Sequence, residues 1–179
     1  MTYFIGIDIA SRGNVVVCLD GNIRADGRKF LTADTACGGS HGHVASGSAD
    51  ITIEEMDLTD MDMIVLPGGL GGVASIRGCQ AAMDAIAFAH ENRRFVAAIC
   101  AGPTVLADLG ITDGKNATCY PGCDSQMGSA NMVCSAAVTD GKLITGTSAG
   151  CAIPFGLALI AALKGRSEAE RIAEQIVIR

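Results

Sequence analysis

The sequence predicts a single α/β domain, three layers thick, in which helices cover both faces of a mostly parallel sheet. From residue 61 onward, short apolar runs alternate with segments of helical periodicity, the order typical of such sheets. The chain has 179 residues, enough to bury a continuous core. Hydrophobic residues make up 49% of it but aromatics only 4%, and it has 23 glycines, a composition that suits aliphatic packing of helices on a sheet.

The first two buried strands are expected at residues 62–66 (DMIVL) and 95–99 (FVAAI). The first ends at Pro67-Gly68-Gly69, a turn signal. Between the two strands, apolar residues recur at helical spacing, which predicts a helix over about residues 76–92. Its apolar positions are Ile76, Cys79, Met83, Ile86 and Ala87.

The second half of the chain continues the alternation. We expect a helix at 101–109 with Gly110 as its C-cap, then a short strand at 117–120 that Pro121-Gly122 breaks. Residues 135–145 predict a hairpin around an Asp-Gly pair. A long apolar helix follows at 149–164, interrupted by Pro154 and closed by Gly165, and a capping box at 167–170 opens the last helix.

The first 50 residues do not follow this scheme. Residues 3–9 predict an opening strand, but a crossover helix does not follow. Instead, 15–19 and 30–31 resemble further strands joined by Asp-Gly turns, and 37–48 form a glycine-serine loop with two histidines. We therefore expect one domain over residues 1–179, with an atypical segment at 1–50 and a regular body at 61–179.

Charge and hydropathy limit the kinds of partner that we expect this protein to bind. The net charge is −6 and no Lys/Arg cluster is present, which argues against nucleic acid. No apolar run approaches the roughly 18 residues of a membrane span, and the N-terminus lacks a basic leader followed by an apolar stretch. We expect a cytoplasmic protein that binds neither nucleic acid nor membrane.

The chain has eight cysteines and no CxxC motif, and without a secretory signal a disulfide framework is not expected. Most are interpreted as small buried hydrophobic residues. Cys100 is the exception, because the buried strand 95–99 runs directly into it and a helix follows. This is the pattern of a nucleophile elbow, in which a strained turn lifts the side chain above the sheet edge. The N-terminus of the following helix favours the thiolate, the reactive form.

Backbone N–H groups for an oxyanion are expected beside this cysteine. Gly68 and Gly69 end the neighbouring strand, and glycines let the backbone approach the crevice above the sheet. The N–H of Ala101 is the second expected donor.

Taken together, four segments resemble the ThiJ/PfpI (DJ-1/PfpI) superfamily, the family of the Parkinson-associated protein deglycase. They are MDMIVLPGG (61–69), AAICAGPTVLADLG (97–110), KNATCYPG (115–122) and LITGTSAGCAIPFGLALIAALKG (143–165). Residues 40–42 and 50–52 are similar to the GSHG turn of the family and the strand after it. The resemblance implies a flavodoxin-like sheet, homodimerisation and a cysteine at position 100 that oxidises readily. It also implies cofactor-independent action on methylglyoxal or early glycation adducts, redox-responsive chaperoning, or peptidase activity in some branches.

Two departures from the family pattern concern its proton-transfer groups. The family glutamate that bonds the elbow cysteine falls near Val17 or Cys18, and no Glu precedes Glu54. Where some members carry a histidine before a proline, this chain has Tyr120. Carbonyl chemistry through an enediol needs proton transfer, so Asp8 and Tyr120 are retained as candidate acid/base or pocket residues.

Two other interpretations of the residues, both as metal-binding sites, lack the further ligands that they require. An opening strand with Asp8, followed by a hairpin, resembles the metal-binding start of ribonuclease-H-like or actin-like domains, but those folds need further carboxylates on later strands. Cys37, His41 and His43 lack a second pair of ligands with supporting spacing. We therefore expect neither a metal nor a cofactor.

Three functions remain open at this point. The first is an enzyme acting on small reactive carbonyls or glycated substrates through a hemithioacetal on Cys100. The second is a redox sensor or chaperone-like protein in which oxidation of Cys100 is the signal. The third is a glutamine amidotransferase or peptidase, which would require a histidine partner for the cysteine.

Overall fold

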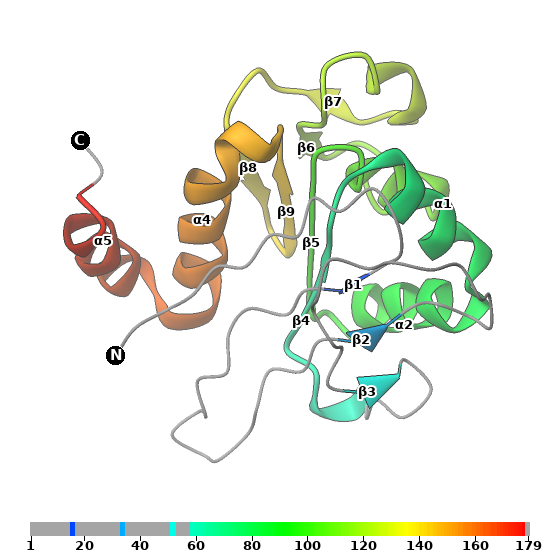
Figure 1. Cartoon of the computed structure of the whole chain (residues 1–179), viewed down its shortest axis with the longest axis horizontal. Helices are drawn as coiled ribbons and strands as arrows, with labels where there is room; N and C mark the ends of the chain where they lie inside the picture. The colour runs from blue at the N-terminus through cyan, green and yellow to red at the C-terminus, as the bar shows by residue number, and fades with distance from the viewer. Residues whose placement is uncertain (1–14, 17–32, 35–50, 53–57, 178–179) are drawn as a thin grey trace.

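The computed structural model describes residues 15–16, 33–34, 51–52 and 58–177 of the chain. Its central sheet has the order β4-β5-β9-β8. The strands are β4 (Met63–Leu66), β5 (Phe95–Ile99), β9 (Leu143–Gly146) and β8 (Ala137–Asp140). β4, β5 and β9 run parallel, and β8 is an antiparallel edge strand (Figure 1).

The strands form because alternate apolar residues are buried on opposite faces. In β4, Ile64 and Leu66 enter one core while Met63 and Val65 enter the other. β5 divides its residues in the same way, with Val96 and Ala98 on the first side and Ala97 and Ile99 on the second. A strand buried on both faces reads as a continuous apolar run, which is how both strands were recognisable in the sequence.

Helices cover both faces, so the predicted three-layer, flavodoxin-like α/β fold is confirmed (Figure 1). The first face carries α1 (Leu70–Gly78), α2 (Gln80–Glu91) and α3 (Pro103–Asp108). The second face carries α4 (Ala152–Lys164), which inserts Phe155 and Leu159 against the sheet. α5 (Arg166–Gln175) packs on the outer side of α4.

The single helix predicted over 76–92 is wrong, because two helices occupy this region. Cys79 separates α1 from α2 in an extended conformation (φ −104°, ψ 103°) and is only 1% exposed. Gly78 precedes it, and glycine is a poor residue for a helix interior. The apolar periodicity continues across the break because Cys79 still enters the core shared by both helices.

Two details of the C-terminal helices also differ from the prediction. Pro154 does not interrupt α4 but lies in its first turn, after a 3₁₀ turn η4 (Ala149–Cys151), where a missing N–H is tolerated. The predicted capping box of α5 is wrong, since Gly165 (φ 93°) is the N-cap and no side chain caps the helix. Glu168 pairs instead with Arg171, at 2.7 Å between Oε1 and Nη2.

The remaining turns follow the sequence more closely. Gly110 adopts the left-handed conformation (φ 68°) beyond α3, and the predicted hairpin joins β8 to β9 through Gly141 (φ 62°). The strand expected at 117–120 is β6 (Asn116–Ala117), which pairs in parallel with β7 (Asn131–Met132). Between them lies the 3₁₀ turn η3 (Asp124–Gln126).

In the first 57 residues the structure describes three short strands. They are β1 (Val15–Val16), β2 (Ala33–Asp34) and β3 (Ile51–Thr52), with β1 antiparallel to β2 and β2 parallel to β3. β1 falls inside the strand predicted at 15–19. The strands predicted at 3–9 and 30–31 and the loop at 37–48 lie outside the described residues. A 3₁₀ turn η2 (Leu58–Asp60) leads into β4, and no helix of the described ranges is long and apolar enough to cross a membrane.

Candidate functional site

Cys100 lies in the turn between β5 and α3 and has a left-handed backbone conformation, with φ at 64°. A non-glycine residue in this conformation carries strain of about 1–3 kcal/mol. Two backbone hydrogen bonds hold it there. Its N–H donates to the carbonyl of Gly146 on β9 at 2.9 Å, and its own carbonyl accepts from the N–H of Tyr120 at 2.8 Å. The backbone geometry of the predicted nucleophile elbow is therefore present.

Two glycines make this turn possible. A Cβ placed on Gly68 would lie 2.5 Å from the Cβ and 3.1 Å from the sulfur of Cys100, so no side chain fits at position 68. A Cβ on Gly102 would lie 2.6 Å from the carbonyl oxygen of Pro67. The turn at 67–69 and the turn at 100–102 are therefore in direct backbone contact, and each depends on the absence of a side chain in the other.

The expected oxyanion donors lie in these same turns. Gly69 (φ 83°) is the N-cap of α1, and Ala101 is the first residue after Cys100. Within the described ranges, neither N–H has a hydrogen-bond acceptor. An unpaired backbone N–H beside a nucleophile is what an oxyanion site requires.

A buried polar link behind the elbow was missed by sequence reasoning. The hydroxyl of Thr104, which is buried, donates to the carbonyl of Ala101 at 2.7 Å and accepts from Nη2 of Arg77 at 3.1 Å. Nε of Arg77 also pairs with Asp108 at 2.6 Å. Residues of α1 and α3 thereby tie down the first turn after Cys100. In the sequence, the only available sign of this link was the threonine at position 104, one helical turn after the predicted nucleophile.

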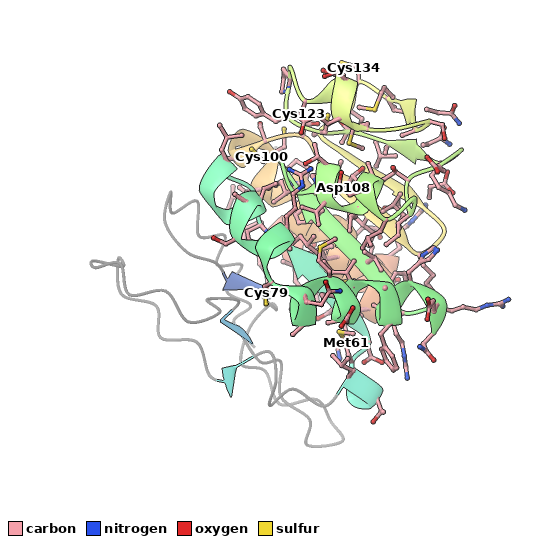
Figure 2. All side chains as sticks on the ribbon, turned by 90° about the vertical axis from the view of Figure 1, so that its right-hand side faces the viewer. Met61, Cys79, Cys100, Asp108, Cys123 and Cys134 are labelled. Atoms are coloured by element: carbon pink, nitrogen blue, oxygen red, sulfur yellow. The ribbon has the colours of Figure 1, made fainter. Side chains whose placement is uncertain are left out.

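Two further thiols approach the elbow from the segment after β6. Burial raises the pKa of the Cys119 thiol to about 11, and the negative charges of Asp124, Cys123 and Cys100 add to this effect. Burial is also the main cause that raises the pKa of the Cys123 thiol, and the negative charge of Cys100 is the second cause. Charges act on a thiol in this way only at short range, and Figure 2 shows Cys123 beside Cys100, with Cys134 farther out. Three cysteines therefore gather at the sheet edge.

The other predicted residues lie as follows. Tyr120 is brought to the site by its backbone, while its side chain is 48% exposed. His90 is exposed near the end of α2. Asp8, Cys37, His41 and His43 lie outside the described residues. In the part of the chain that the structure describes, no His, Cys, Asp and Glu side chains are grouped as a metal site.

The sequence and the fold are similar to those of known proteins. Protein dj-1beta of Drosophila melanogaster is 31% identical over 131 residues, covering 72% of this chain and 70% of its own. The crystal structure of that protein superposes with a TM-score of 0.67, covering 73% of this chain and 72% of its own. An oxidized DJ-1 of Toxoplasma gondii has a TM-score of 0.67 at 29% identity, covering 72% of this chain and 71% of its own.

A protein of Pyrococcus abyssi named as a deglycase is 29% identical over 128 residues, covering 69% of this chain and 75% of its own. The matched region spans only 30% and 33% of two DJ-1 homologues of Arabidopsis thaliana, which are longer proteins. The sequence profile of the DJ-1/PfpI family matches residues 15–162 of this chain. This match spans most of the chain and includes both turns of the elbow, so the chain belongs to the DJ-1/PfpI family.

Proposed function

We propose that this protein acts on small reactive carbonyl compounds or early glycation adducts, with Cys100 as the nucleophile and without a cofactor. The observation that carries the proposal is the left-handed conformation of Cys100 at the strand-to-helix turn. This conformation presents a partly exposed thiol above the sheet edge, beside unpaired backbone donors. The name of the Pyrococcus relative, a deglycase, agrees with this reaction class.

The first chemical step is addition to an aldehyde. The Cys100 sulfur forms a bond to the aldehyde carbon, and the carbonyl π electrons move to the oxygen. The N–H groups of Gly69 and Ala101 are the proposed donors to that oxyanion, and protonation then completes a hemithioacetal. No atom is lost in this step, so it requires no leaving group and no redox partner.

The later steps need a group that moves a proton between carbon and oxygen. Cys100 makes its hydrogen bonds with described residues through its main chain, so no carboxylate or imidazole of those residues bonds to its sulfur. Tyr120, whose N–H donates to the carbonyl of Cys100, is the candidate in the described part, and Asp8 is the candidate outside it. Tyr120 is proposed as a pocket residue that contacts the substrate.

The test is conversion of methylglyoxal to lactate by the full-length protein. We expect turnover in the wild type and a loss of at least about a hundredfold in Cys100→Ser, because the alkoxide needed by serine is far less available than a thiolate. Cys134→Ser is the matched control, since Cys134 is also a free cysteine but is exposed and distant from the elbow (Figure 2). Unchanged turnover in Cys100→Ser would refute the proposal.

A second candidate function is redox sensing through oxidation of Cys100. The lack of an acid or base bonded to the sulfur among the described residues favours it, because oxidation needs only the thiolate. The crystal structure of an oxidized relative from Toxoplasma agrees with it. Formation of a sulfinic acid on Cys100 under mild peroxide, in a protein that does not consume methylglyoxal, would select this function over the first.

The proposal also covers the domain organisation, the oligomeric state and the cellular location of the protein. We propose one domain over residues 1–179, a homodimer, and a cytoplasmic location. Support for a dimer comes from exposed apolar side chains around the described body, of which Leu70 is 80% exposed. Sedimentation equilibrium of the full chain tests it, and a monomer at micromolar concentration would refute it.

A further inference from the structure

The segment from Tyr120 to Cys123 folds back onto the elbow. The N–H of Tyr120 donates to the carbonyl of Cys100, and the N–H of Cys123 donates to the carbonyl of Tyr120 at 2.9 Å. Between them Gly122 has a left-handed conformation (φ 93°), which reverses the chain. Cys123 consequently turns inward and is only 8% exposed. The same turn that holds the carbonyl of Cys100 thus brings a second thiol towards it.

We propose that Cys123 is the resolving thiol of Cys100, and that the two residues form an intramolecular disulfide after a hydroperoxide has oxidised Cys100. In the first step the Cys100 thiolate attacks the distal peroxide oxygen. The O–O bond breaks, an alkoxide or hydroxide leaves, and Cys100 becomes a sulfenic acid. In the second step the Cys123 sulfur, having given up its proton, attacks the Cys100 sulfur and displaces hydroxide, which leaves as water. Two electrons pass from the two thiols to the peroxide.

Cys119 is the competing partner, and the structure favours Cys123 over it. Cys119 is 4% exposed, and its thiol donates to the carbonyl of Tyr120 at 3.5 Å, which directs the sulfur to its own main chain. The charge of Cys100 is the largest charge effect on Cys123, whereas for Cys119 it follows those of Asp124 and Cys123. The positive charge of Arg77 acts on Cys123 in the opposite direction and favours its thiolate. Cys123 is therefore the partner thiol that the structure favours.

The proposal uses the reactive Cys100 on which the proposed function also rests, but it adds a partner that carbonyl chemistry does not need. A disulfide would protect Cys100 from irreversible oxidation, because thiols regenerate it whereas they do not reduce a sulfinic acid. It would also block the carbonyl reaction while it lasts.

The test is a disulfide map of the whole protein. The reduced protein receives one equivalent of hydrogen peroxide, free thiols are alkylated, and the chain is cut before aspartates without reductant. Cys100 then lies in peptide 84–107, Cys119 and Cys123 in 113–123, and Cys134 in 124–139. We expect peptides 84–107 and 113–123 to be joined, with fragment ions that place the bond on Cys123.

Matched variants complete the test. The link should persist in Cys119→Ser and disappear in Cys123→Ser, where the share of Cys100 that dithiothreitol recovers should fall at least about tenfold as sulfinic acid accumulates. A bond to Cys119, or sulfinic acid on Cys100 of the wild type with Cys123 free, would overturn the proposal. Alkylation of Cys100 in the reduced protein and methylglyoxal turnover are measured on the same samples. If Cys100 is alkylated and supports turnover but forms no disulfide, only the proposal that Cys123 is the resolving thiol is rejected. If Cys100 is neither alkylated nor needed for turnover, the proposed function itself is rejected.

Discussion

Gly68 and Cys100 are in such close contact that a single methyl group on Gly68 would lie 2.5 Å from the Cβ of Cys100. This distance is far below any normal carbon–carbon contact, and the nearby atoms include the carbonyl oxygen of Ile99 at 3.0 Å, which belongs to the backbone. The turn that ends β4 therefore acts as the floor of the thiol site.

Gly68→Ala should displace the elbow. We expect a loss of about 1–3 kcal/mol in the free energy of unfolding, typical of overpacking, and slower alkylation of Cys100. Urea denaturation and iodoacetamide kinetics measure the two effects. Gly72→Ala is the matched control, because a Cβ on Gly72, inside α1, meets no described atom within 4 Å beyond the backbone of its own helix. It should be neutral or stabilising by up to about 1 kcal/mol, and equal behaviour of the two variants would contradict the contact.

The strain at Cys100 can be measured by removing the thiol in two ways. Cys100→Gly should be more stable than Cys100→Ala by about 1–2 kcal/mol, because glycine adopts the left-handed conformation at no steric cost. Both variants lack the sulfur, so their difference reports on the Cβ and the backbone at position 100 and not on the thiol. Thermal or urea unfolding gives the comparison, and an alanine variant as stable as the glycine variant would mean that position 100 is unstrained.

The hydroxyl of Thr104 should position the turn after Cys100. Thr104→Val keeps the volume but leaves Arg77 and the carbonyl of Ala101 without this partner, so we expect a loss of about 1–3 kcal/mol in unfolding free energy. Methylglyoxal turnover should fall as well, since the N–H of Ala101 is a proposed oxyanion donor. Thr104→Ser restores the hydroxyl and should recover turnover. Equal turnover in the valine and serine variants would show that the link is only structural.

The raised pKa of Cys119 makes stability depend on pH in alkaline solution. Its pKa rises from 9.0 to about 11 on folding, so the native state holds the proton more tightly than the unfolded chain. This stabilisation is complete below pH 9.0 and is lost as pH rises to about 11. Urea unfolding at several pH values should therefore show a steeper decline for the wild type than for Cys119→Ser. Parallel pH profiles would indicate that Cys119 ionises normally in the folded protein.

The strands, the two-sided burial and the elbow followed from the sequence because each is encoded locally. An uninterrupted apolar run such as 62–66 indicates a strand buried on both faces, and small residues around a cysteine at a strand end indicate a tight turn. The hairpin at 135–145 was equally local, since an Asp-Gly pair and two apolar runs define it.

The features that were missed depend on tertiary contacts. Gly78 is a local sign that a helix ends before Cys79, but the apolar character of Cys79 is the same in either conformation and hides the break. Gly165 shifts the start of α5 through its backbone conformation, which overrides the capping residues after it. The Arg77–Thr104 hydrogen bond joins residues 27 positions apart, and the approach of Cys123 to Cys100 depends on a chain reversal at Gly122.

The close contact between the turns at 67–69 and 100–102 divides the positions around Cys100 into those that tolerate substitution and those that do not. The thiol is placed by main-chain atoms and by missing side chains, so almost any substitution at positions 68 or 102 would displace it. Leu70 and Tyr120, by contrast, border the same elbow with exposed side chains that carry little packing. Selection can therefore change the size and polarity of the entrance while the sulfur of Cys100 stays in place, which would give the proposed nucleophile access to a changing range of substrates.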